Sequence, residues 1–265
     1  MACVRPEPMK TIADPACGTG EFFLGACYWL TRPGQTLNKR QAAFLNNSTF
    51  FGNEIVPGTR RLCLMHLVLH SIVDMTGDRT GEPLIDRADA LLTKPARTFD
   101  DVLANPPFGK KSSMTFTNAE GEDDRESLTY ERRDFWTTTS NKQLNFLQHI
   151  VSMLGSQGKA AVVLPDNVLF EGGAGEKIRR KWLETCDVHT ILRLPTSIFY
   201  AGREGQRGVF RCPAQRRCGV NQGRVVLRPA RQPALHAEDA AAGLRRSARL
   251  RRPLQPRQPP LAAGQ

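Results

Sequence analysis

Short apolar runs alternate with amphipathic stretches through the first 202 residues of the chain. Such runs predict buried strands, and apolar residues that recur every three or four positions predict helices. Strands are expected at residues 11–13, 49–52, 84–85, 99–104, 160–164 and 188–194. Helices are expected at residues 22–30, from 57 onward, from 140 to 154 and at 174–186. This alternation predicts an α/β fold, a doubly wound, mostly parallel sheet wrapped by helices.

Two of these helices carry more specific expectations. The helix that begins at Pro57 has Leu62, Met65 and Leu69 on one face, and proline suits a first helical turn. The sequence Ser-Asn-Lys-Gln at 140–143 has the form of a capping box, in which a serine side chain would close the start of the helix.

Charge divides the chain into two parts. Residues 1–202 contain 23 basic and 23 acidic side chains, whereas residues 203–265 contain 14 Arg, no Lys and three acids. The formal net charge of +11 therefore lies entirely in the last 63 residues. Hydrophobic periodicity also ends near residue 202. The chain is thus expected to consist of a core at 1–202 and an Arg- and Pro-rich, disordered tail at 203–265.

Composition excludes several classes of protein. No apolar stretch reaches the roughly 20 residues that span a membrane, and the first ten residues lack the apolar core of a signal peptide. The seven cysteines form no CxxC pair and do not cluster with the five histidines. We therefore expect no membrane span, no metal site and no disulfide framework, and a location in the reducing cytoplasm.

The string DPACGTGEF at 14–22 joins the first expected strand to the first helix. Its glycines let backbone N–H groups approach a ligand closely, but GTG lacks the full GxGxxG spacing and alone also suits an ordinary tight turn. The complete string resembles the S-adenosylmethionine loop of amino-methyltransferases, although Glu21 stands where Gly is commoner. The cofactor-binding residues that this resemblance implies are Asp14, Pro15, Ala16, Cys17, Gly18, Thr19, Gly20 and Phe22.

Two acids follow the next two expected strands. Glu54 ends the second strand, where a carboxylate can accept hydrogen bonds from both ribose hydroxyls of a nucleotide. It lies farther from Gly20 than the dinucleotide fold requires, and a polar insert at 31–47 accounts for the excess. Asp89 follows the third strand, and by the same resemblance it would meet the adenine amino group of the cofactor. A solvated strand-end charge is the alternative for Glu54.

The sequence Asn105-Pro106-Pro107-Phe108 follows the fourth expected strand. Methyl transfer to an exocyclic amine requires acceptors that hold the NH2 group in line with the methyl donor. The side-chain oxygen of Asn105 and the rigid carbonyl of Pro106 can do this, and Phe108 offers a face for a flipped base. The charged run at 120–133 is interpreted as a solvated loop that could help to cover that base.

NPPF alone also suits enzymes that methylate rRNA guanine or a glutamine side chain. Further strings distinguish between these classes of methyltransferase. RDFW at 133–136, TSNKQLNF at 139–146, LPDNVLFEG at 164–172 and RLPTSIFY at 193–200 resemble type I restriction modification subunits. The resemblance covers residues 5–202. It implies a class I S-adenosylmethionine-dependent methyltransferase that modifies N6 of adenine in DNA. It also implies DNA, a DNA-specificity subunit and a restriction subunit as partners.

The chain departs from this family at both ends. Members carry a helical domain before the glycine-rich loop, and an apolar last strand that inserts antiparallel beside the sixth. The N-terminal domain and the last strand are both expected to be missing, and loss of the strand would expose a sheet edge. A reading-frame shift or truncation is favoured over a phosphate-binding basic arm as the origin of the tail. An inactive remnant, or an RNA or protein methyltransferase, are the alternative functions.

Overall fold

The computed structural model of the 265-residue chain describes residues 1–73, 83–107, 113–117, 123–127, 129–188, 190–194, 207–213 and 226–229. Met1–Pro229 form one compact unit. Phe108 and the end of the RLPTSIFY string lie outside the described residues, as does most of the expected tail. None of the helices in the described ranges is long and apolar enough to cross a membrane.

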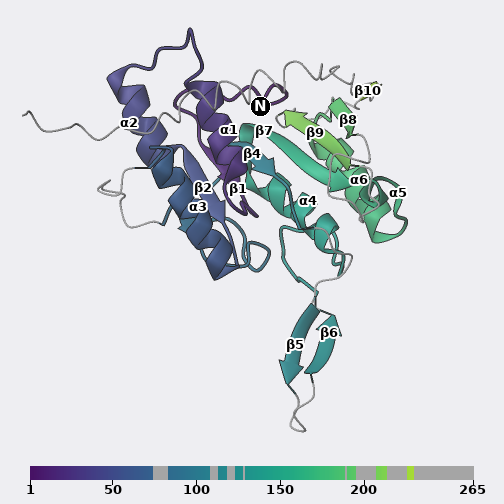
Figure 1. Cartoon of the computed structure of the whole chain (residues 1–265). Helices are drawn as coiled ribbons and strands as arrows, with labels where there is room; N and C mark the ends of the chain where they lie inside the picture. The colour runs from purple at the N-terminus through teal and green to yellow at the C-terminus, as the bar shows by residue number, and fades with distance from the viewer. Residues whose placement is uncertain are drawn as a thin grey trace, which may run out of the picture. The chain divides into compact units, whose positions relative to one another are not determined.

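A twisted central sheet organises the described part of the chain (Figure 1). Its strands follow the order β10-β8-β9-β7-β4-β1-β2-β3, and every neighbouring pair is parallel except those that involve β9. The strands are β1 (Ile12–Asp14), β2 (Phe50–Asn53), β3 (Ile85–Asp86), β4 (Phe99–Ala104), β7 (Leu154–Pro165), β8 (Thr190–Leu194), β9 (Arg207–Pro213) and β10 (Val226–Pro229). The expected doubly wound, mostly parallel sheet is confirmed.

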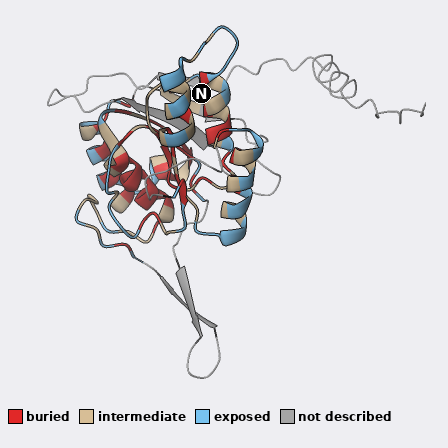
Figure 2. Cartoon of the chain, turned by 90° about the vertical axis from the view of Figure 1, so that its left-hand side faces the viewer, coloured by how far each residue is buried: buried red, intermediate tan, exposed pale blue. Residues whose placement is uncertain are grey.

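Helices cover both faces of this sheet. Successive strand residues point to opposite faces, so Ile12 packs into one apolar cluster and Ala13 into the other. Side chains of α1, α2 and α3 fill the first cluster, and those of α4 and α6 fill the second. Figure 1 shows these helices beside the sheet, and Figure 2 colours their buried residues red. The helices are α1 (Glu21–Leu30), α2 (Lys39–Ser48), α3 (Pro57–Leu69), α4 (Lys142–Met153), α5 (Asn167–Phe170) and α6 (Ala174–Thr185).

The structure contradicts the expected loss of the last strand. β9 inserts antiparallel between β7 and β8, with Val162 opposite Phe210 and Ile191 opposite the same residue. The arginines around Val209 and Phe210 concealed this strand in the sequence, because a short apolar core between charges gives no clear alternation. β7 is therefore an interior strand. The division of the chain at residue 202 stays a prediction.

The polar insert at 31–47 contains most of α2, which begins with a capping box between Asn38 and Gln41. Two local expectations were wrong. The segment interpreted as a solvated loop contains part of an antiparallel hairpin, formed by β5 (Ser113–Thr117) and β6 (Asp123–Ser127). α4 is capped by Asn141, whose side-chain oxygen accepts the N–H groups of residues 143 and 144, and not by the preceding serine.

The apolar row on α3 faces solvent. Leu62, Met65 and Leu69 lie on the exposed side of the helix, and Leu69 is 74% exposed. The buried residues of α3 are Cys63 and Leu67, which pack into the cluster with α1 and β2. Helical spacing of apolar residues thus identified the helix but not the face that it buries.

Candidate functional site

The glycine-rich loop closes against the end of β2 through one carboxylate. Glu54 accepts the backbone N–H of Gly18 at 3.1 Å through Oε2 and that of Val56 at 2.8 Å through Oε1. The N–H of Cys17 also bonds the carbonyl of Asn53 at 3.0 Å. Hydrogen bonds therefore join the loop after β1 to the turn after β2, 36 residues away in the sequence, at the carboxyl edge of the sheet.

Two glycines give this loop its path. Gly18 and Gly20 have φ angles of +56° and +86°, in the left-handed region that L side chains rarely adopt. A Cβ atom at Gly18 would meet nothing within 4 Å, so the backbone there borders open space. A Cβ atom at Gly20 would lie 2.8 Å from Sγ of Cys63 on α3. Gly18 is thus free to face a ligand, while Gly20 holds the start of α1 against α3.

A Gly20→Ala variant is expected to lower the free energy of unfolding by at least about 1 kcal/mol, from left-handed strain plus the close contact with Cys63. Gly34→Ala is the matched control, because Gly34 has a φ of +87° but open space around its Cβ position. Urea unfolding measures both variants. Equal destabilisation of the two would show that the contact with Cys63 contributes nothing.

Asp14 ends β1 behind the loop and is only 2% exposed. Burial raises the pKa of its carboxyl group from the ordinary 3.8 to about 7, and the nearby Glu54 adds to the rise. A hydrogen bond of 2.9 Å from the N–H of Ala16 to Oδ1 acts in the opposite direction. The loop thus carries a buried acid whose ionisation is costly, a feature common at functional sites.

Asp89 follows β3 and is held by two donors. Its Oδ1 accepts the N–H of Leu91 at 3.0 Å, and its Oδ2 accepts the hydroxyl of Tyr130 at 2.7 Å. The sequence indicated Asp89 but gave no sign of its tyrosine partner, which comes from a segment 41 residues away.

The Asn-Pro-Pro turn follows β4 directly. β4 pairs in parallel with β1, with Ala13 opposite Val102, so Asn105 and the glycine-rich loop emerge at the same edge of the sheet. Asn105 and Pro107 are exposed, whereas Pro106 is buried. The structure thus brings the loops after β1, β2 and β4 together, since these three strands are neighbours. Phe108 lies outside the described residues.

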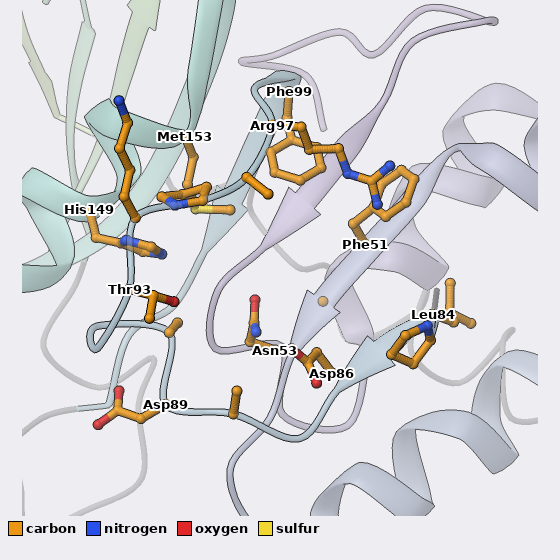
Figure 3. A pocket seen from close by; sticks show the side chains of 17 residues that line it. Phe51, Asn53, Leu84, Asp86, Asp89, Thr93, Arg97, Phe99, His149 and Met153 are labelled. Carbon is orange, nitrogen blue, oxygen red and sulfur yellow. The ribbon is translucent and has the colours of Figure 1, made fainter. Parts of the chain in front are cut away.

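A pocket of about 360 Å³ adjoins this edge, on the face of the sheet that α4 covers (Figure 3). Asn53, Asp86 and Asp89 line one end of it, and Phe51, Phe99, Met153 and Arg97 line the other. The guanidinium of Arg97 lies 3.7 Å from the centre of the Phe51 ring. Sequence reasoning missed both Asn53 and Arg97, because Asn53 served only as a flank of Glu54 and Arg97 belongs to no recognisable string.

His149 of α4 also lines this pocket. Burial, followed by the charge of Arg132, lowers the pKa of His149 to about 3. Its Nδ1 lies 2.8 Å from the guanidinium of Arg132, so Nδ1 accepts that hydrogen bond and the imidazole is neutral. The wall of the pocket beside α4 therefore carries no charge from this side chain at neutral pH.

Comparisons with known proteins agree with this arrangement. The chain is 42% identical over 205 residues to the type I restriction enzyme EcoKI methylase subunit of Escherichia coli K12, and 41% identical to the StySPI methylase subunit of Salmonella potsdam. Each alignment covers 75% of this chain and 35% of the subunit. The chain thus spans about a third of the length of these relatives.

Solved structures show the same fold. The crystal structure of the EcoKI M protein superposes with a TM-score of 0.64 and 36% identity, over 80% of this chain and 41% of that one. A putative type I modification subunit from Vibrio vulnificus YJ016 gives a TM-score of 0.62 and 26% identity, over 79% and 41%. A putative class I S-adenosylmethionine-dependent methyltransferase from Listeria monocytogenes, 13% identical with a TM-score of 0.58, shares the fold.

The family model described as N-6 DNA Methylase matches residues 1–205, more than three quarters of the 265 residues. The match contains the glycine-rich loop, both strand-end acids and the Asn-Pro-Pro turn. The sheet order, the loops gathered at its carboxyl edge and the similarity to modification subunits point the same way. The chain belongs to the N-6 DNA methylase family.

Proposed function

We propose that this chain is the catalytic core of a type I modification methylase, which transfers a methyl group from S-adenosylmethionine to N6 of adenine in DNA. The observation that carries the proposal is the meeting of two loops at one edge of the sheet. The glycine-rich loop after β1, tied to Glu54, lies beside the Asn-Pro-Pro turn after β4. In parallel α/β sheets ligands bind at this edge.

The residues at the edge fit an adenosine-type cofactor. Open space in front of Gly18 leaves room for a ligand against the loop backbone. Each oxygen of Glu54 accepts one backbone N–H and keeps a second lone pair, so the carboxylate can still accept two ribose hydroxyls. Asp89 would accept the adenine amino group. When bound, S-adenosylmethionine supplies an electrophilic methyl group.

The Asn-Pro-Pro turn would hold the target base. The side-chain oxygen of Asn105 and the carbonyl of Pro106 would accept the two amino hydrogens, which turns the nitrogen lone pair toward the methyl group. Phe108 would stack on the flipped adenine. DNA, a specificity subunit and a restriction subunit are the proposed partners, and the cytoplasm is the proposed location.

Isothermal titration with S-adenosylmethionine tests this proposal against an inactive remnant. Clear binding by the purified chain supports an enzyme core, and absence of binding supports a remnant. Transfer of labelled methyl groups to DNA, RNA and protein substrates, with and without a specificity subunit, then identifies the substrate. Labelling of RNA or protein in preference to DNA would contradict adenine-N6 methylation of DNA.

Glu54→Gln is expected to weaken binding of S-adenosylmethionine by about 1–3 kcal/mol, because a charged acceptor of ribose hydroxyls is lost. Isothermal titration measures the change. Glu176→Gln is the control, since Glu176 is an exposed acid on α6 that pairs with Arg180 in the next turn. An affinity of Glu54→Gln equal to that of the wild type would refute ribose binding by Glu54.

A further inference from the structure

Tyr130 connects two parts of the proposed site that are distant in the sequence. It lies between the Asn-Pro-Pro turn and α4 and is only 5% exposed. Its ring packs with Leu91 and Phe146, and this cluster contacts Ala16 of the glycine-rich loop. Its hydroxyl donates to Oδ2 of Asp89 at 2.7 Å. A buried tyrosine hydroxyl that bonds a carboxylate is a directional contact, beyond what ring packing alone requires.

The segment that carries Tyr130 is fixed by Arg132, whose side chain is 5% exposed. Its guanidinium makes a two-pronged contact with Asp134 at 3.0 and 2.6 Å. The same group donates to the carbonyls of Ala90 and Leu91 at 3.5 and 3.3 Å. Arg132 also bonds His149 and a serine of α4. The turn that contains Asp89 is therefore attached to both the 130–134 segment and α4.

We propose that Tyr130 is a positioning residue for cofactor selection, which orients the Asp89 carboxylate toward the adenine amino group. The inference rests on the proposed function, because it requires that Asp89 meets the adenine. The N–H of Leu91 holds one oxygen of Asp89 and the tyrosine hydroxyl holds the other. With both oxygens held, the carboxylate plane does not rotate, and its remaining lone pairs keep a single direction.

This arrangement selects for a 6-amino purine. An adenine amino group donates a hydrogen bond to the oriented carboxylate. Hypoxanthine has a carbonyl oxygen at the same position, which would face the carboxylate as a second acceptor and leave both groups without a hydrogen. Without the tyrosine hydroxyl the carboxylate can turn away, so the penalty against the 6-oxo purine should shrink.

Tyr130→Phe tests the proposal, because it removes the hydroxyl and keeps the buried ring. Isothermal titration of the full chain compares S-adenosylhomocysteine with S-inosylhomocysteine. The wild type should prefer the adenosyl compound, and the variant should lose about fivefold of that preference, because adenosyl binding weakens and the penalty against the inosyl compound shrinks. Tyr28→Phe is the matched control, since the Tyr28 hydroxyl bonds His70 at 2.9 Å on the surface of the chain.

A purely structural role predicts a different result. If Tyr130→Phe weakened both compounds equally, or changed neither, the positioning role would be wrong. In an Asp89→Ala background the tyrosine substitution should leave the preference unchanged, and a further change there would also overturn the proposal. If the wild type bound neither compound, the proposed cofactor site would fail together with this inference. If the wild type bound the adenosyl compound but Tyr130→Phe kept the same preference, only the inference about Tyr130 would be wrong.

Discussion

Asp14→Asn is expected to stabilise the chain at pH 8 and to weaken its binding of S-adenosylmethionine. Burial raises the pKa of Asp14 to about 7, so the folded chain retains a proton that the unfolded chain releases near pH 3.8. The wild type should therefore lose stability as the pH rises from about 4 to 7, by an upper limit of about 4 kcal/mol. Asparagine carries no ionisation cost and still accepts the N–H of Ala16.

Urea unfolding at pH 5 and pH 8, together with titration of the cofactor, measures both effects. Asp101→Asn is the matched control. Burial raises the pKa of Asp101 to about 6, but Asp101 lies within β4 and not in a loop at the carboxyl edge. It should flatten the pH dependence of stability without loss of cofactor affinity. An Asp14→Asn variant that was no more stable at pH 8 would show that the carboxyl group is not costly to ionise in the fold.

The same measurement must account for His149, whose contribution has the opposite sign. Its folded pKa of about 3 lies below the ordinary 6.5, so the unfolded chain takes up a proton first as the pH falls. His149 therefore favours unfolding below about pH 6.5, whereas the two aspartates favour it as the pH rises. Comparison of each variant with the wild type at the same pH separates these contributions.

Asn105→Ala is expected to reduce methyl transfer to DNA by about 100-fold or more, the usual cost of removing an oriented polar group from a transition state. Binding of S-adenosylmethionine should change little, because the cofactor contacts proposed here lie on the loops after β1, β2 and β3. The rate of methyl transfer is measured with labelled cofactor in an active assembly that contains a specificity subunit. Isothermal titration measures the affinity for S-adenosylmethionine.

Asn47→Ala serves as the control for this experiment, because Asn47 is an exposed residue of α2. It should leave both quantities unchanged. Methyl transfer by Asn105→Ala at the wild-type rate would mean that the target amine is held by other groups. A parallel loss of cofactor affinity would instead assign Asn105 to the cofactor side of the site.

The sequence predicted those parts of the fold in which local pattern and tertiary packing agree. The expected strand at 99–104 matches β4, because its apolar run at 102–104 is buried on both faces of the sheet. α2 was missed because its composition is mostly polar, although the Asn-Lys-Arg-Gln sequence at 38–41 is a capping box that should have indicated it. The exposed row on α3 shows that spacing does not specify which face is covered.

The candidate site could likewise be predicted only in part. The glycine-rich loop, Glu54 and the Asn-Pro-Pro turn could be placed at one edge because they follow strands of a parallel sheet. The contacts of Tyr130 with Asp89, and of Arg132 with the neighbouring turn, could not be predicted. They depend on side-chain directions across separations of 41 residues, which no local pattern encodes. The roles of these side chains in binding stay predictions.

The position of β9 has a consequence for the order of events during synthesis. β9 lies between β7 and β8, yet it leaves the ribosome after both of them. At about 5–20 residues per second, the 41 residues between β7 and β9 delay the emergence of β9 by roughly 2–8 s after that of β7. During that interval β8 has no docking place on the sheet and β7 presents an open edge to other chains. Slower translation of the segment between β7 and β9 should therefore increase aggregation of newly made chains, without any change in the stability of the finished protein.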